Sequence, residues 1–184
     1  APAGGGADKV ATFIWTQEFD TLNPHYTNMW FSQITHQLWN CWAWDFDELN
    51  NPIPRLVTEM PTVENGGVSA DGTVITMSLK PDMVWSDGDP LDAEDFLFTY
   101  DMVMNTNNAV ASTYPFSEIT SIEAPDPLTV VMTFQYPFAP WVATLWRGIL
   151  PEHILAPVFE AEGTIDQAEW NTAPTVSCGP FKFL

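Results

Sequence analysis

Apolar and β-branched residues recur in short runs along the chain, separated by turns rich in Pro, Gly, Asn and Asp. Such runs are typical of strands, whereas apolar positions repeating at intervals of three and four are typical of amphipathic helices. The pattern predicts strands over residues 10–16, 42–46, 73–79, 118–124, 129–134 and 180–184, and helices from Thr27 to Trp39, from Asp92 to Asn105, and after Pro140 and Pro151. Because helices and strands are intermixed, the predicted fold class is α/β or mixed α+β, with helices packed against sheets.

The helix predicted over residues 92–105 has the clearest beginning. Asp92 is a suitable N-cap, and acidic side chains in the first turn are favoured by the helix dipole. A calcium loop would need alternating oxygen ligands with glycine at the sixth position and glutamate at the twelfth. Here Pro90 and Leu91 interrupt the run, and the twelfth residue from Asp87 is Phe98. We therefore interpret the segment as a turn before a capped helix, and expect no metal and no cofactor, although it holds the densest group of carboxylates: Asp87, Asp89, Asp92, Glu94 and Asp95.

The composition is strongly acidic. Asp and Glu number 24 against 5 Lys and Arg, which gives a formal net charge of −19. Binding to nucleic acid or to anionic lipid requires clustered basic side chains. The charge balance therefore excludes a nucleic-acid partner and argues against adhesion to an anionic membrane. No run of about 18 apolar residues is present, so no segment of this sequence is predicted to span a membrane.

Catalytic motifs are absent from the sequence. It contains no Gly-x-Ser-x-Gly, no His-Glu-x-x-His and no phosphate-binding loop, and His25, His36 and His153 lie far apart. Among 24 acidic residues, carboxylate pairs of the kind that hydrolyse glycosides arise by chance. We expect no catalytic residue and a protein that is not an enzyme. An extracellular hydrolase that uses paired carboxylates is the alternative from a different class.

Three segments together resemble the family 5 extracellular solute-binding proteins, which serve ABC importers as receptors for dipeptides, oligopeptides and nickel. Met83–Phe96 (MVWSDGDPLDAEDF) resembles the family stretch in which an aromatic residue, Asp-Gly, Pro-Leu and Ala-Glu-Asp lead into a helix. Ser177–Phe183 (SCGPFKF) is similar to the family's Gly-Thr-Gly-Pro-Tyr-Lys-Leu. The opening, with Leu22-Asn23-Pro24 followed by Leu38-Trp39, is similar to the family's Leu-Asp-Pro and Leu-Tyr-Glu. Asn40, Ser177 and Cys178 depart from the family pattern.

The resemblance implies a domain organisation like the first lobe of a periplasmic binding protein. Residues 1–8 read as a flexible, Gly-rich tether, and residues 9–45 would form the first segment of the main domain. A smaller inserted α+β domain would span residues 46–172, and residues 173–184 would return to the main domain as a strand. Because the sequence stops on an apolar strand at Leu184, we expect it to be an excerpt.

The function implied by the resemblance is capture of a small ligand outside the cytoplasm and its delivery to an ABC permease. Peptide is the expected ligand class because it is the commonest in the family, and oligosaccharide is the alternative, since the chain has nine Trp. The expected location is periplasmic or extracellular. Contact with the membrane would be made only through a lipid tether that lies outside this sequence.

Candidate ligand-binding residues come from the aromatic surplus and the scarce cations. Aromatic residues make up 14 % of the chain, and rings beyond those needed for the core can line a cleft. The resemblance places segments around residues 114–116 and 146–148 near the cleft. A cation in so negative a chain could select an anionic ligand group, or it could pair with a neighbouring acid. The candidates are Tyr26, Trp30, Tyr114, Phe116, Trp146 and Arg147.

The two cysteines, Cys41 and Cys178, are compatible with one disulfide or with two free thiols. The resemblance places both in the main domain and implies an oxidising location. A disulfide there would join the two ends of the inserted domain. Both states stay open at this point.

Overall fold

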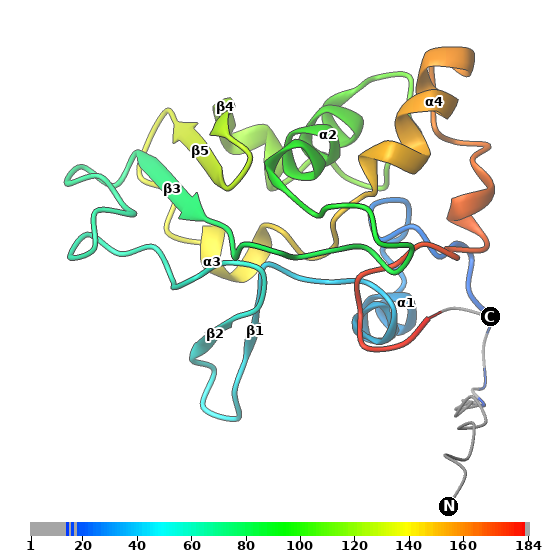
Figure 1. Cartoon of the computed structure of the whole chain (residues 1–184), viewed down its shortest axis with the longest axis horizontal. Helices are drawn as coiled ribbons and strands as arrows, with labels where there is room; N and C mark the ends of the chain where they lie inside the picture. Colours follow the sequence, from blue (N-terminus) through cyan, green and yellow to red (C-terminus); the bar gives the residue numbers. More distant parts are fainter. Residues whose placement is uncertain (1–13, 15, 17, 183–184) are drawn as a thin grey trace, which may run out of the picture.

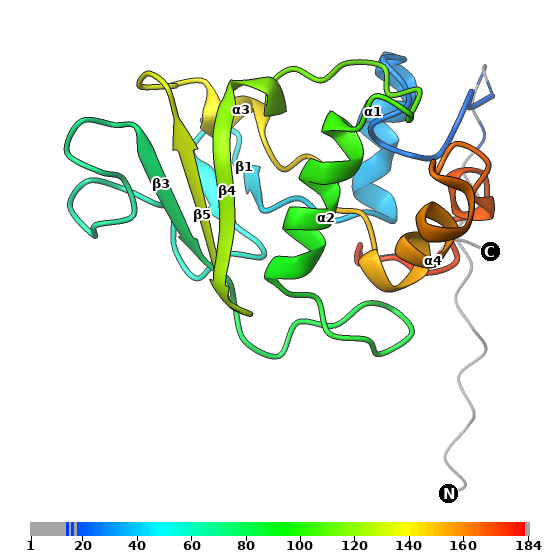
Figure 2. The same ribbon diagram turned by 90° about the horizontal axis from the view of Figure 1, so that it is seen from above.

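The computed structural model describes residues 14, 16 and 18–182, and it places a sheet at one end of the molecule and α1 and α4 at the other, with α2 between them (Figures 1 and 2). The sheet is antiparallel in the order β3–β5–β4, formed by β3 (Val74–Ser78), β5 (Thr129–Phe134) and β4 (Ile119–Asp126). A separate hairpin pairs β1 (Trp44–Phe46) with β2 (Pro52–Pro54). The helices are α1 (Trp30–Thr35), η1 (His36–Leu38), α2 (Ala93–Met104), η2 (Phe116–Glu118), α3 (Trp141–Thr144), α4 (Glu152–Glu162) and η3 (Glu169–Asn171).

The central strand β5 forms one wall of the main core. Val130, Met132 and Phe134 are buried at alternating positions, as a strand with one covered face requires. Met132 lies opposite Ile75 of β3 on one side and Ile122 of β4 on the other. The face that these residues share packs against α2, so the sheet and α2 bury a common apolar layer.

α2 begins with a reciprocal cap. The Asp92 side chain accepts a hydrogen bond from the Glu94 N–H at 2.9 Å, and the Asp95 side chain accepts one from the Asp92 N–H at 3.2 Å. These bonds satisfy N–H groups that have no partner within the helix. The sequence-based prediction of a capped helix over residues 92–105 is confirmed.

The β1–β2 hairpin projects away from the rest of the molecule (Figure 1). Its base is fixed by Trp44, whose indole N–H donates to the Val142 carbonyl at 2.6 Å. At the tip, Leu49 is 74 % exposed. The strand predicted over residues 42–46 is present as β1, over Trp44–Phe46, whereas the sequence pattern did not indicate β2.

The segment that follows α1 meets the last described residues of the chain. The Gly179 N–H donates to the Trp39 carbonyl at 2.9 Å, and the Phe181 N–H donates to the Leu38 carbonyl at 3.0 Å. Figure 1 shows the C-terminal segment running next to α1. A disulfide joins Cys41 and Cys178 at the same place, with the two Cα atoms 5.2 Å apart.

Gly179 has no room for a side chain at this contact. A Cβ atom there would lie 2.5 Å from the Trp39 carbonyl carbon. We expect Gly179→Ala to lower the free energy of unfolding by about 2 kcal/mol, because the backbone of one segment must move. Urea unfolding followed by tryptophan fluorescence measures this. The control Thr175→Ala, at an exposed position of the same segment, should change stability by less than about 0.5 kcal/mol, and an equal loss in both variants would contradict the explanation.

The structure confirms some of the remaining predictions of secondary structure and contradicts others. The strands predicted around residues 73–79, 118–124 and 129–134 and the helices after Pro140 and Pro151 are confirmed. The helix predicted from Thr27 begins only at Trp30, and the predicted last strand is wrong over Pro180–Lys182, which has irregular backbone. Most of the predicted strand over residues 10–16, the tether at 1–8 and residues 183–184 lie outside the described part. The domain boundaries near residues 45 and 172 stay a prediction.

Candidate functional site

The loop Trp146–Ile149 is held rigidly from its first residue. Trp146 is 1 % exposed, and its indole packs edge to face on Phe96 at 5.0 Å and on Phe116 at 5.2 Å. Its backbone φ of 57° lies in the left-handed region, which is unfavourable for residues other than glycine. Such conformations occur preferentially at functional sites. The buried ring therefore fixes an unusual backbone turn immediately before Arg147.

The far side of the same loop is fixed by three other segments. Gly148 has φ of 123°, and a Cβ there would lie 2.7 Å from Pro24. The Gly148 carbonyl lies 3.1 Å from His25 Nε2, and the Ile149 N–H donates to Asn40 Oδ1 at 3.3 Å. Burial lowers the pKa of His25 to about 4, so the ring is neutral at physiological pH and donates its Nε2–H to this carbonyl.

Arg147 is the exposed residue of this otherwise buried loop. Its guanidinium carbon lies 5.2 Å from the centre of the Trp42 ring, and the two residues also pair through an antiparallel backbone bridge. Partial burial lowers the pKa of Arg147, but an arginine stays charged at neutral pH. Its guanidinium has no hydrogen bond or ion pair with any described residue. The other described basic side chains each donate to the protein: Arg55 to Asp45, Lys80 to Pro54 and Lys182 to Ser86.

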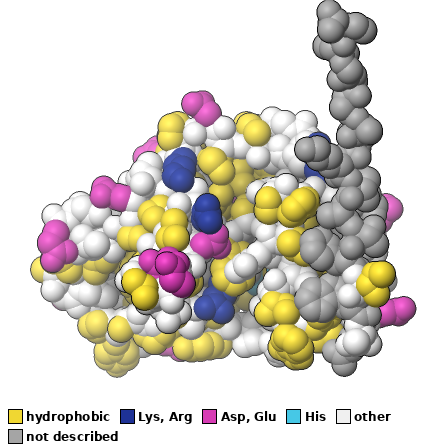
Figure 3. Space-filling model, turned by 90° about the horizontal axis from the view of Figure 1, so that it is seen from below, with side chains coloured by type: hydrophobic (Ala, Val, Ile, Leu, Met, Phe, Trp, Pro, Cys, Tyr) yellow, Lys and Arg dark blue, Asp and Glu magenta, His cyan; other side chains and the backbone are white. Residues whose placement is uncertain are grey.

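A pocket of about 380 Å³ adjoins Trp42. On the face seen in Figure 3, basic side chains lie near one another, with acidic and hydrophobic side chains between them. The backbone of Ala43 lies between two segments that carry arginines: its N–H donates to the Trp146 carbonyl, and its carbonyl accepts from the Arg55 N–H. The lining residues are Gln37, Asn40, Cys41, Trp42, Asp45, Arg55, Leu56, Met83, Cys178, Gly179 and Pro180.

The other predicted ligand contacts are scattered over different environments. Trp30 on α1 is 66 % exposed, and Tyr114 is 52 % exposed with its ring against Phe138. Phe116 is buried together with Trp146, so both serve the core of the described chain. The half-buried Tyr26 donates its hydroxyl to Asp166 Oδ1 at 2.7 Å, and burial raises its pKa. The structure therefore does not bring the six candidates together, and their role as ligand contacts stays a prediction.

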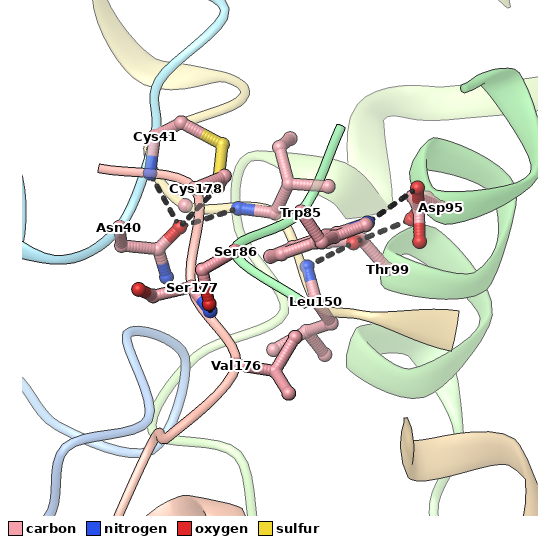
Figure 4. Close-up of a disulfide and its surroundings, with 12 residues drawn as sticks. Asn40, Cys41, Trp85, Ser86, Asp95, Thr99, Leu150, Val176, Ser177 and Cys178 are labelled. Carbon is pink, nitrogen blue, oxygen red and sulfur yellow. Dashed lines mark hydrogen bonds between the residues drawn. A yellow bond between two sulfur atoms is a disulfide. The ribbon is translucent and has the colours of Figure 1, made fainter. Parts of the chain in front are cut away.

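Asn40 is a site residue that the sequence analysis noted only as a departure from a family pattern. Its Oδ1 accepts from the Cys41 N–H at 2.7 Å as well as from Ile149, and lies 3.7 Å from the Cys178 sulfur (Figure 4). The side chain is 4 % exposed. Asn40 thus connects the disulfide to the loop that carries Arg147. A shorter or apolar residue could not make these bonds.

A second buried polar group, Asp95, lies on α2 beyond Trp85 (Figure 4). Its carboxylate accepts from the Trp85 indole N–H at 3.0 Å, the Glu152 N–H at 2.9 Å and the Asp92 N–H at 3.2 Å. Burial raises its pKa to about 6. Because all its partners belong to the fold, Asp95 joins α2 to the start of α4 and is a structural group.

Metal binding finds no support in the described part of the chain. No group of three or more His, Cys, Asp or Glu side chains there could hold a metal ion. In the acidic segment, His153 lies between two carboxylates, with Nε2 3.0 Å from Asp87 and Nδ1 3.4 Å from Asp89.

Among the described helices, none has the length and apolar composition that a membrane span requires.

Comparison with known proteins gives one family and several relatives. Residues 51–184 match the model of the bacterial extracellular solute-binding proteins, family 5 (Middle). A putative ABC transporter peptide-binding protein of Brucella ovis is 35 % identical over 100 residues, covering 54 % of this chain and 19 % of the relative. A periplasmic alpha-galactoside-binding protein of Rhizobium meliloti is 38 % identical over 116 residues, covering 56 % of this chain and 15 % of the relative.

A solved structure shows the same fold. The crystal structure of NikZ from Campylobacter jejuni, in complex with Ni(L-His), superposes with a TM-score of 0.76 at 26 % identity, covering 91 % of this chain and 31 % of NikZ. The mixed helix and sheet arrangement is therefore that of a periplasmic-binding-protein-like family. The chain spans about a fifth of the length of the Brucella relative that it matches.

Proposed function

The chain belongs to the bacterial extracellular solute-binding proteins of family 5, and on this premise we propose that it captures a small ligand, a peptide, for delivery to an ABC importer. Members of the family are binding proteins, so no covalent step is involved. In this proposal residues 9–45 and 173–184 contribute to the main domain of one lobe and residues 46–172 form the inserted domain. The location is extracytoplasmic, with a lipid tether outside this sequence as the only membrane attachment.

The observation that carries the proposal is the unpaired guanidinium of Arg147 on its fixed loop. A peptide and the histidine of Ni(L-His), the ligands named for two of the proteins above, both carry a carboxylate. An arginine offers two parallel N–H groups that match a carboxylate. Because the loop is already ordered by Trp146, Gly148 and Ile149, a ligand would not have to immobilise it on binding, which favours affinity. We propose that Arg147 binds the ligand carboxylate.

We expect Arg147→Gln to weaken binding of tri-alanine by about 10- to 100-fold, because a charge-assisted hydrogen bond to the carboxylate is lost. Isothermal titration calorimetry of the purified chain measures this. The control Lys80→Gln removes the same charge from a lysine that donates to the Pro54 carbonyl, and should leave the affinity unchanged. Equal affinities for wild type and Arg147→Gln would contradict the assignment.

An oligosaccharide is the second candidate ligand. The identity to the alpha-galactoside-binding protein of Rhizobium meliloti favours it, and the exposed rings of Trp30 and Tyr114 could stack on sugars. A neutral sugar carries no carboxylate to pair with the charge of the Arg147 guanidinium. Raffinose, an α-galactoside, separates the two proposals in the same calorimeter: binding of raffinose that is unaffected by Arg147→Gln would replace peptide by oligosaccharide.

A further inference from the structure

Trp42 contacts Arg147 in two independent ways. The indole lies under the guanidinium, 5.2 Å from ring centre to Cζ, and the two backbones form an antiparallel bridge. A guanidinium stacked on an aromatic face is attracted by the ring and keeps its N–H groups free in its own plane. The stack therefore restricts the orientation of the Arg147 side chain and leaves the N–H groups of the guanidinium available for a ligand.

Trp42 also lines the pocket of about 380 Å³ described above. Apolar and sulfur-containing side chains, among them Leu56, Met83 and Pro180, form much of its lining together with the Cys41–Cys178 disulfide. The single acidic residue of the lining is Asp45, which is paired with Arg55 at 2.5 Å. In a chain with 24 acids, this pocket thus presents no unpaired carboxylate of the described residues to an anionic ligand.

We propose that Trp42 is a positioning residue that orients Arg147 toward a ligand carboxylate, and that the pocket beside Trp42 receives the apolar side chain next to this carboxylate. This rests on the proposed function of Arg147 and narrows the ligand class to peptides with an apolar last residue. The two features have Trp42 in common, because its ring contacts the Arg147 guanidinium and also lines the pocket. In this proposal the ligand carboxylate lies at Arg147 and the adjoining side chain enters the pocket. The volume is large enough for an aromatic side chain.

The test uses the 184-residue chain and three dipeptide probes: Ala-Phe, its C-terminal amide, and Ala-Gly. Nuclear magnetic resonance follows the indole N–H of Trp42 and the Nε–H of Arg147 during each titration. We expect wild type to bind Ala-Phe more tightly than either of the other probes. Trp42→Leu should weaken Ala-Phe binding about three- to tenfold and lower the preference for acid over amide, because the guanidinium loses its aromatic support.

The outcomes separate the two levels of the proposal. If Arg147→Gln abolishes the preference for acid over amide while Trp42→Leu retains it, the positioning role is wrong and the function of Arg147 stands. If wild type shows no such preference, the function of Arg147 is itself wrong. Equal binding of Ala-Gly and Ala-Phe overturns the role of the pocket. Trp42→Phe guards against misfolding of the leucine variant: its smaller ring must reduce the acid preference in the same direction, and an unchanged preference contradicts the proposal.

Discussion

Removing the disulfide by Cys41→Ala together with Cys178→Ala is expected to lower the free energy of unfolding by about 4 to 5 kcal/mol. The two cysteines are separated by 137 positions, so the crosslink restricts a long loop of the unfolded chain, whose closure then costs no further entropy on folding. For a chain of this size, such a loss corresponds to a melting temperature lower by roughly 10 to 15 °C.

Urea unfolding of the double variant and of wild type, each with and without reductant, measures the effect. The chain has two cysteines, so no other disulfide can form in their place. Wild type under reducing conditions should match the double variant, which itself should not respond to the reductant. A wild type whose stability is the same with and without reductant would show that the crosslink does not stabilise the fold.

Asp95→Ala is expected to lower the free energy of unfolding by about 3 to 4 kcal/mol at neutral pH, because it leaves buried hydrogen-bond donors without an acceptor. The donors are the indole N–H of Trp85 and the backbone N–H groups of Asp92 and Glu152. Asp101→Ala is a suitable control on the same helix, because Asp101 is exposed. This substitution should change the free energy of unfolding by less than about 0.5 kcal/mol. Chemical denaturation of both variants at pH 7 gives the comparison.

The Asp95 variant should also change the pH dependence of stability. Burial raises the pKa of the folded-state carboxyl to about 6, above its usual value near 4, so folding favours the protonated form. The contribution of Asp95 is therefore fully present below pH 4 and decreases as the pH rises to about 6. The difference in unfolding free energy between wild type and Asp95→Ala should be larger at pH 4 than at pH 7. If the stability difference between wild type and Asp95→Ala instead increases with pH, the ionised carboxylate is favoured in the folded state. The three hydrogen-bond donors would then stabilise the charged form by more than burial destabilises it.

Local patterns explain which parts of the fold could be predicted. The start of α2 follows from Asp92 and the acids after it, because a cap depends on neighbours within one turn. β2, in contrast, consists of Pro-Ile-Pro and exists only because β1 lies beside it. A three-residue strand of this composition shows no alternation of apolar and polar positions, so the sequence pattern does not predict it. The last described residues show the reverse case: Pro180–Lys182 has a strand-like composition, but its backbone does not pair with a named strand. The Phe181 N–H donates to the Leu38 carbonyl, and the Lys182 side chain donates to the Ser86 carbonyl.

The candidate site was predicted only in part, for a related reason. Arg147 stands out in the sequence since basic residues are scarce, and the family resemblance directed attention to its segment. Its neighbours Trp42 and Asn40 lie more than a hundred positions away in the sequence, so no local pattern links them to it. Composition alone also cannot distinguish a buried ring from an exposed one, and Phe116 and Trp146 are both buried in the core.

The disulfide also has a mechanical consequence. Because Cys41 and Cys178 are covalently joined next to α1, tension applied to the two ends of the chain passes through the sulfur–sulfur bond. The intervening residues, which include the sheet, α2, the hairpin and the Arg147 loop, form a closed ring outside the line of force. A force applied to the segments outside the two cysteines would therefore break the contacts of those segments first, while the residues between the cysteines carry no tension and stay folded.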